Sequence, residues 1–242
     1  MQAPLLAGVL AAGLLAGCQR HDAQADAAAA AAQAAAREEA ARPIEAAFNE
    51  ALAAQNWIAA KAQADVLFAQ YPQSQAAARV RPHYEAVTAR AEAAREQGRL
   101  ANLWSYDKTP VQGGTQLSAS IYAKDDLDTD GSGAKPVRLI FRDHPSWGTS
   151  SYLVLQAGDF ACYGGCRVKV QVDDQPAQPM AASRPKTDEA IAMFVEDEKA
   201  LWRKARGAKK TLAITFPVKA GGTRTAVFET AGVDPAQLPR WR

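Results

Sequence analysis

The chain has 242 residues, of which 48% are hydrophobic, and its formal net charge at pH 7 is +2. A positive charge this weak and dispersed argues against a nucleic-acid partner. The length allows one or two domains. Because the composition changes near Trp104, from alanine-rich to rich in β-branched residues and glycine, we expect two domains with separate cores.

The chain begins with a short apolar segment, in which residues 5–15 are all small or apolar. This segment is too short to span a bilayer and is typical of a signal peptide. It leads into Leu-Ala-Gly-Cys, ending at Cys18, which resembles the lipobox of bacterial lipoproteins. The resemblance implies a signal peptide over residues 1–17, cleavage before Cys18, and acylation of its sulfur and its new amine. Gln19 stands where an aspartate can signal inner-membrane retention, which implies anchoring in the outer membrane, facing the periplasm.

Three cysteines are present. With Cys18 assigned to the lipid, Cys162 and Cys166 remain as an even pair in an oxidising compartment. Two glycines between them suit a disulfide across a hairpin end. A redox pair would be better served by two intervening residues at a helix N-terminus, and a metal site would have His144 as its one nearby third ligand. We therefore expect a structural disulfide, with a redox pair and a metal site as the two alternatives.

The first hundred residues have the pattern of helices. Residues 18–42 are polar or alanine and predict a partly helical tether, because they offer no apolar stripe. Pro43 is expected to open the first ordered helix. A second helix is expected over residues 57–71. Ser74 is placed as the N-cap of a third helix, which is interrupted at Pro82 and continues to about residue 104.

One part of this helical region resembles a known repeat. The stretch from Asn56 to Ser74, with Trp57, the small residues Ala60 and Ala64, and then Phe-Ala-Gln-Tyr-Pro-Gln-Ser, resembles the tetratricopeptide helix pair of envelope lipoproteins. The resemblance implies a helical, tetratricopeptide-like domain over residues 43–103. Because repeat proteins need about three units to bury a continuous core, a single unit favours a structural spacer, with a peptide-binding groove as the alternative.

From Gln116 the apolar residues recur with a period of two. Gly, Pro and Asp turns separate seven short candidate strands, at residues 117–123, 136–142, 151–156, 166–172, 191–195, 212–218 and 225–230. This pattern predicts an antiparallel sandwich or open barrel over residues 104–242, and an α+β fold for the whole chain. An inserted helix is expected over residues 197–206, with Gly207 as its C-terminal cap, and Asp234-Pro235 is expected to open a short closing helix.

The order of elements in this second domain is similar to a known family. A two-cysteine hairpin runs into Val168, Val170 and Val172, a Phe194-Val195 strand is followed by a helix, and a final hairpin ends at Gly232. This order resembles the invasion-associated locus B type of periplasmic domain. The resemblance implies a non-enzymatic envelope β-domain and carries over no functional residue.

An acidic loop has part of a calcium-binding pattern. In the numbering of a twelve-residue calcium-binding loop, the positions 1, 3 and 5 are Asp126, Asp128 and Asp130, and position 6 is Gly131. Position 12 is Val137, which cannot supply the bidentate carboxylate. We expect a solvated hairpin loop and no cofactor, with weak calcium binding as the alternative.

Asp143, His144 and Ser146 are the residue types of a hydrolytic site. They are near neighbours in a turn stiffened by Pro145, and such neighbours cannot easily line up as nucleophile, base and orienter. The sequence has no Gly-x-Ser-x-Gly motif and no phosphate-binding loop. We therefore expect a surface turn and no catalytic residue, and a periplasmic hydrolase with a site near His144 stays an alternative.

The densest positive run lies at the end of the inserted helix, and we name it the basic segment: Arg203, Lys204, Arg206, Lys209 and Lys210. Its cations could simply complement the helix dipole, with Trp202 turned inward. They could also contact an anionic envelope component. Together these features predict a lipid-anchored, non-catalytic binding or scaffold module whose partner is an envelope protein, peptidoglycan or anionic lipid.

Overall fold

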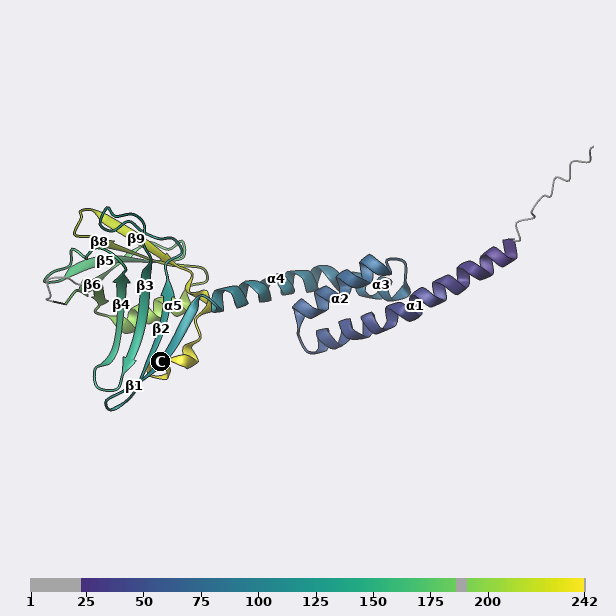
Figure 1. Cartoon of the computed structure of the whole chain (residues 1–242), viewed down its shortest axis with the longest axis horizontal. Coiled ribbons are helices and arrows are strands. Elements are labelled where there is room, and N and C mark those ends of the chain that lie inside the picture. The colour runs from purple at the N-terminus through teal and green to yellow at the C-terminus, as the bar shows by residue number, and fades with distance from the viewer. Residues whose placement is uncertain (1–22, 186–190, 242) are drawn as a thin grey trace, which may run out of the picture. The chain divides into compact units, whose positions relative to one another are not determined.

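The computed structural model describes residues 23–185 and 191–241, so the predicted signal peptide and Cys18 lie outside the described residues. The chain divides into two compact units, Met1–Thr88 and Ala89–Arg242. Helices form the first unit, and antiparallel strands with further helical segments form the second (Figure 1), which confirms the predicted α+β class. Among the described residues, no helix has the length and apolar character needed to cross a membrane.

Helix α1 (Ala23–Ala53) contains Pro43 in its interior, so the prediction that Pro43 opens the first ordered helix is wrong. The sequence before Pro43 is rich in alanine, which has the highest helix propensity of all residue types. This composition extends the helix toward the N-terminus. An interior proline removes one backbone hydrogen bond and costs about 3 kcal/mol. Pro43 and Glu39, whose carbonyl group lacks its helical partner, are both exposed residues.

The core of the first unit is built from small side chains. Helices α2 (Trp57–Gln70) and α3 (Gln75–Val80) pack on α1, and Ala60 and Ala64 are fully buried beside Leu67. Their burial lets the helices approach closely. The predicted second helix and the Ser74 cap, which accepts a hydrogen bond from the Ala77 N–H, are confirmed, and the tetratricopeptide resemblance stays a prediction.

An ion-pair network fixes the short helix α3 on α1. Arg79 donates from Nε to Glu45 at 2.6 Å and from Nη2 to Glu38 at 3.1 Å. Glu38 also accepts a hydrogen bond from the backbone N–H of Gln75, at the start of α3. The hydrogen bond from Arg79 lowers the pKa of Glu45. Polar contacts thus supplement a core that has little apolar area to bury.

The third predicted helix is interrupted as expected. A 3-10 turn, η1 (Arg81–His83), separates α3 from α4 (Tyr84–Ala101), because Pro82 cannot donate the next helical hydrogen bond. Helix α4 crosses the division between the two units, which lies ahead of the domain boundary expected at residue 104.

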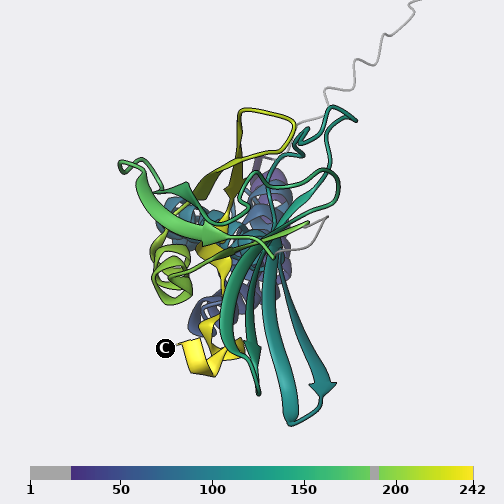
Figure 2. The ribbon, with the colours of Figure 1, turned by 90° about the vertical axis from the view of Figure 1, so that its left-hand side faces the viewer.

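The second unit holds one antiparallel sheet. Within the described residues it has nine strands in the order β1-β2-β3-β4-β7-β6-β5-β8-β9, and it curves strongly (Figure 2). Because β1 and β9 lie at its two edges, the sheet is open, which is closer to the open barrel than to the sandwich. Its strands are β1 (Trp104–Val111), β2 (Gly114–Tyr122), β3 (Val137–His144), β4 (Gly148–Leu155), β5 (Cys166–Val172), β6 (Gln178–Ser183), β7 (Ala192–Val195), β8 (Leu212–Pro217) and β9 (Thr223–Phe228).

All seven predicted strands are confirmed, and two further strands were missed. Strand β1 is an exposed edge strand that contains Pro110, and prolines in a sheet favour such edges. Strand β6 contains Pro179 and two alanines, which are poor strand formers. Neither segment has the alternating β-branched pattern that marks a strand in sequence.

Helix α5 (Glu198–Gly207) covers one face of the sheet, together with the C-terminal 3-10 turns (Figure 2). The ring of Phe141 on β3 contacts Trp202 of α5 at a centroid distance of 4.9 Å and Trp241 at 5.4 Å. The inserted helix and the short closing helix η3 (Pro235–Gln237) are confirmed. Gly207 is the last helical residue rather than the cap, and Ala208 follows it in extended conformation.

The predicted disulfide is confirmed. The sulfur atoms of Cys162, in the loop between β4 and β5, and Cys166, the first residue of β5, are 2.03 Å apart. Gly164 and Gly165 have φ angles of +78° and +102°, which residues with a side chain rarely adopt. The two cysteines are therefore bonded to each other and do not form the alternative metal site with His144.

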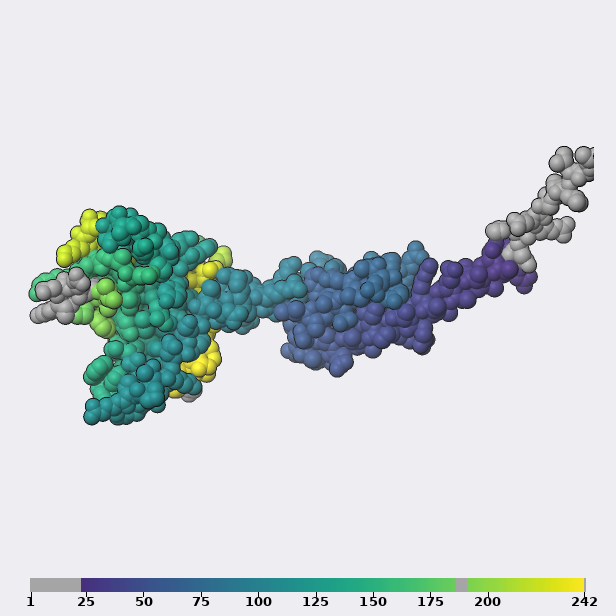
Figure 3. All heavy atoms as spheres, in the orientation of Figure 1, coloured from purple at the N-terminus to yellow at the C-terminus, as the bar shows by residue number. Residues whose placement is uncertain are grey.

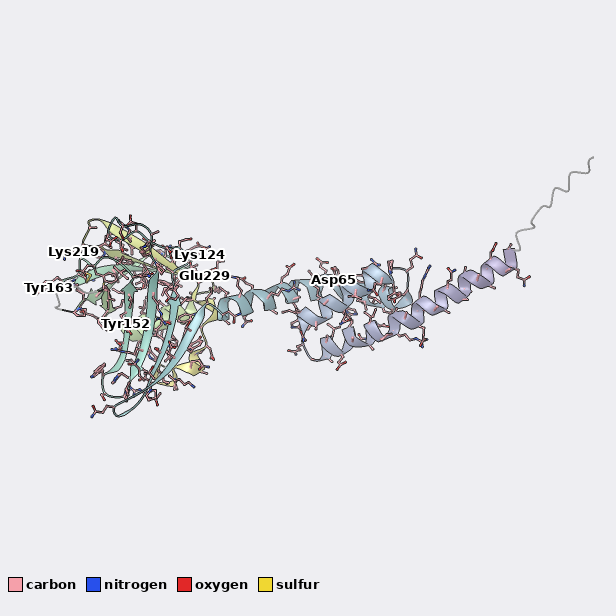
Figure 4. The ribbon with its side chains drawn as sticks, viewed as in Figure 1. Asp65, Lys124, Tyr152, Tyr163, Lys219 and Glu229 are labelled. Carbon is pink, nitrogen blue, oxygen red and sulfur yellow. A yellow bond between two sulfur atoms is a disulfide. The ribbon has the colours of Figure 1, made fainter. Side chains whose placement is uncertain are left out.

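The end of α4 packs tightly against the segment that follows β9, within the second unit. A Cβ atom on Gly232 would lie 2.2 Å from the carbonyl carbon of Leu100, a distance that leaves no room for a side chain. Arg99 of α4 also donates to Glu229, labelled in Figure 4, at 2.8 Å. The sequence between β9 and the C-terminus thus forms the seat for the last turn of α4.

We predict that Gly232→Ala destabilises the second unit by about 2–3 kcal/mol, because the added carbon overlaps backbone atoms that cannot move freely. Urea unfolding, followed by the fluorescence of the buried tryptophans, measures the change. Gly98→Ala, in helix α4, is the matched control, since a Cβ there meets no described atom within 4 Å. It should stabilise the chain by up to about 1 kcal/mol. Equal unfolding midpoints for the two variants would contradict the proposed close packing.

Candidate functional site

His144 has a structural role at the end of β3. Its ring is 6% exposed, and its Nδ1 atom accepts hydrogen bonds from the backbone N–H groups of Ser146 at 3.1 Å and Trp147 at 3.3 Å. Asp143 points to the opposite side of the strand and pairs with Arg240 at 2.7 Å. The structure therefore does not bring Asp143, His144 and Ser146 together as a catalytic triad.

The carboxylates of the acidic loop bind the backbone of the loop itself. Asp128 accepts a hydrogen bond from the Gly131 N–H at 2.6 Å, and Asp130 accepts one from the Ser132 N–H at 2.9 Å. Hydrogen bonding with Ser132 lowers the pKa of Asp130. No group of three or more His, Cys, Asp or Glu residues able to hold a metal ion occurs within the described part of the chain. Asp126, Asp128 and Asp130 are thus not gathered into a calcium cage.

The basic segment lies on α5 and in the turn that follows it. Trp202 is 1% exposed and faces the core, as predicted. Arg203 and Arg206 are exposed, and Lys204 is half-buried and donates to Gln178 at 2.6 Å. The side chains of the two remaining members, Lys209 and Lys210, are also exposed. Four cations therefore reach solvent from one short stretch of chain.

Asp173, which the sequence analysis did not single out, fixes the turn of the basic segment. Its carboxylate accepts hydrogen bonds from the backbone N–H groups of Lys209, Lys210 and Thr211, at 2.8–2.9 Å. These bonds, led by the one from Lys209, lower the pKa of Asp173. An aspartate directly after a strand such as β5 indicates a turn. The turn that its carboxylate binds follows α5, far along the chain, and could not be identified from the sequence.

The structure also presents an open sheet face that the sequence analysis missed. In Figure 1 strands β3 and β4 lie in front of α5, and their atoms are at the surface in Figure 3. Half-buried side chains alternate with buried ones along both strands. Tyr152, labelled in Figure 4, lies on this face, and the guanidinium of Arg142 lies 5.4 Å from its ring centroid. Trp147, in the turn between the strands, is 71% exposed.

Comparisons with known proteins give little further information. No protein-family model matches the chain, and no curated protein matches its sequence. Among solved structures, the chain is similar to the crystal structure of invasion associated protein B from Bartonella henselae, with 18% identity and a TM-score of 0.36. The match covers 57% of this chain and 91% of that one. It is in line with the faint resemblance seen in the sequence and says nothing about function.

We predict that Asp173→Asn lowers the free energy of unfolding at pH 7 by about 1 kcal/mol, the usual contribution of a hydrogen bond to stability. Because the pKa of Asp173 is lower in the folded chain, the carboxylate stabilises the fold above its unfolded pKa of about 3.9. That contribution is lost as the pH falls through the folded pKa.

The difference between the wild-type chain and the Asp173→Asn variant should therefore shrink as the pH falls below about 4. Urea unfolding at a series of pH values measures it. Asp174→Asn is the matched control, because Asp174 is exposed and its side chain makes no hydrogen bond within the described part of the chain. A constant difference across this pH range would contradict the prediction.

Proposed function

We propose that this protein is a lipid-anchored lipoprotein of the outer membrane that faces the periplasm, and that it is a non-catalytic binding module. In this proposal its second unit docks on an anionic membrane surface through the basic segment. The observation that carries the proposal is the exposure of Arg203, Arg206, Lys209 and Lys210, on a helix that the buried Trp202 holds in place and in the turn that follows it.

The energetics of such docking fit a tethered protein. Each cation close to an anionic membrane surface contributes about 1 kcal/mol, so four exposed cations give weak attraction. A lipid anchor would keep the unit near the membrane, and the high local concentration makes weak attraction sufficient. Because the charges are exposed, salt should weaken the docking.

The first part of α1 suits the role of a spacer. Residues 23–37 are exposed throughout, and they follow the proposed lipidation site at Cys18 closely. As a helix these residues extend about 22 Å. Such a spacer would separate the folded part of the first unit from the lipid head groups while leaving the protein attached.

The non-catalytic part of the proposal draws on the residues that could have performed hydrolysis. His144 accepts two backbone hydrogen bonds at its Nδ1 atom, and Asp143 is paired with Arg240. Both side chains are almost fully buried. Their interactions account for their presence without a chemical reaction.

We predict that the full chain carrying Cys18→Ser, and therefore without lipid, sediments with vesicles of phosphatidylglycerol and phosphatidylcholine at low salt. Replacing all five residues of the basic segment by glutamine should abolish most of this binding. The matched control replaces five exposed cations elsewhere in the same unit by glutamine, which are Lys108, Lys124, Lys135, Arg167 and Lys169.

The control should retain binding, and an ionic strength of about 0.15 M should weaken it, because exposed charges are screened over about 8 Å there. Equal loss in both variants would mean that net charge alone attracts the protein. Absence of binding at low salt, or binding equal to that of phosphatidylcholine vesicles, would reject docking by the basic segment.

A separate prediction concerns the anchor. In cells supplied with a palmitate analogue, the wild-type protein should be labelled and found in the membrane fraction. The Cys18→Ser variant should lose the label, because it lacks the sulfur atom that forms the thioether. Cys162→Ser is the control and should remain labelled. A labelled, membrane-bound Cys18→Ser variant would disprove lipidation at this position without bearing on the basic segment.

A further inference from the structure

Arg142 is held in a fixed position on the open sheet face. Its Nε atom donates to the hydroxyl of Ser150, its register partner on β4, at 3.2 Å. Its guanidinium lies 5.5 Å from the ring centroid of Trp147 and 5.4 Å from that of Tyr152, within the range of cation–π attraction. These three contacts restrain a side chain that would otherwise lose much entropy on binding a ligand.

The two terminal nitrogens of Arg142 are available to a ligand. Within the described residues they have no hydrogen-bonded protein partner, and Arg142 forms no ion pair. Arg138, on the same strand, donates instead to Ser120, and Arg184, directly after β6, pairs with Asp159. A positioned guanidinium with free terminal nitrogens matches the bidentate geometry of a carboxylate.

Trp147 supplies a rigid aromatic surface beside this group. Its indole stacks on the ring of His144, with a centroid distance of 3.9 Å and an interplanar angle of 14°. The two backbone hydrogen bonds to His144 Nδ1 come from this same turn, so the ring and the turn support each other. Although the His144 ring covers part of the indole, Trp147 is 71% exposed, so most of its surface is open to solvent.

We infer that Trp147 and Arg142 form a binding site for a carboxylate-bearing sugar. The open indole face would pack on the apolar face of a pyranose ring, and the guanidinium would take the carboxylate. One aromatic surface and one charged group correspond in size to a single sugar residue. Ser118 and Ser150, the register partners of Arg142 on β2 and β4, offer hydroxyl groups for a sugar beside the guanidinium.

Arg142 points away from α5, because its neighbour Phe141 contacts Trp202 of α5 and side chains alternate along a strand. The site shares no residue with the basic segment, and its test needs neither a membrane nor a lipid. The sugar site and docking by the basic segment can therefore fail independently of each other.

The test is isothermal titration calorimetry of the full chain carrying Cys18→Ser. The two probes are N-acetylmuramic acid and N-acetylglucosamine, which share a ring and an N-acetyl group and differ by the lactyl carboxylate. We expect the acidic sugar to bind at least about ten-fold more tightly, as charge-assisted hydrogen bonds allow. Equal binding of the two sugars, or no heat of binding for either at millimolar concentration, would overturn the inference.

Variants locate the site. Arg142→Gln should weaken binding of the acidic sugar at least about ten-fold. Trp147→Ala, which removes an exposed indole and leaves the backbone N–H groups that bind His144 in the chain, should weaken it about five-fold or more. Arg167→Gln is the matched control, an exposed arginine on β5, and should leave the affinity unchanged. Unchanged binding by Trp147→Ala would overturn the inference, whatever the folding of the Arg142 variant.

A glutamate-rich peptide is the third probe, because a carboxylate could also come from a protein. Binding of the peptide that is tighter than binding of the acidic sugar, and that is lost in Arg142→Gln, would overturn the sugar assignment in favour of a protein partner. In the expected result, the indole N–H resonance of Trp147 shifts with N-acetylmuramic acid and not with the peptide.

Discussion

The second unit depends on the packing of aromatic rings around Phe141. This residue lies on β3 and contacts Trp202 of α5 and Trp241 near the C-terminus, so it joins three distant parts of the sequence. Aromatic side chains bury more apolar area than any other type, which fixes α5 on one face of the sheet. The next residue, Arg142, points to the other face because side chains alternate along a strand. Phe141 therefore helps to hold the helix that carries part of the basic segment, and the neighbouring Arg142 belongs to the proposed sugar site on the opposite face.

The two units are stabilised in different ways. The core of the first consists mainly of alanines with Phe48 and Leu67, and it is supplemented by the network of Arg79 with Glu38 and Glu45. The second has a large core of aromatic and branched side chains. A small-residue core gains less from burial per residue, so the first unit depends more on close helix approach and on polar contacts at its surface.

Several aspartates and His144, whose residue types suggest metal binding or catalysis, accept hydrogen bonds from the backbone and hold it in place. Asp128 and Asp173 accept N–H groups of turns, Asp234 caps a 3-10 turn, and His144 accepts N–H groups through its ring. A buried or bent backbone needs such partners. Residue types alone therefore overstate the chance of chemistry, whereas an exposed indole beside an arginine with free terminal nitrogens gives a more specific indication of binding.

The sequence by itself determined the elements whose signals are local. Apolar periods of 3.6 and two located α2 and the seven predicted strands. Ser74 and Asp234 marked the starts of α3 and η3, and the spacing of Cys162 and Cys166 with two glycines indicated the disulfide. Only the tertiary structure decided the rest. Strands β1 and β6 exist because neighbours pair with them despite weak propensity, and Pro43 is carried inside a helix that alanine extends. Arg142 and Trp147, or Asp173 and the lysine turn, meet through strand register and packing, which depend on contacts between distant residues and leave no local pattern in the chain.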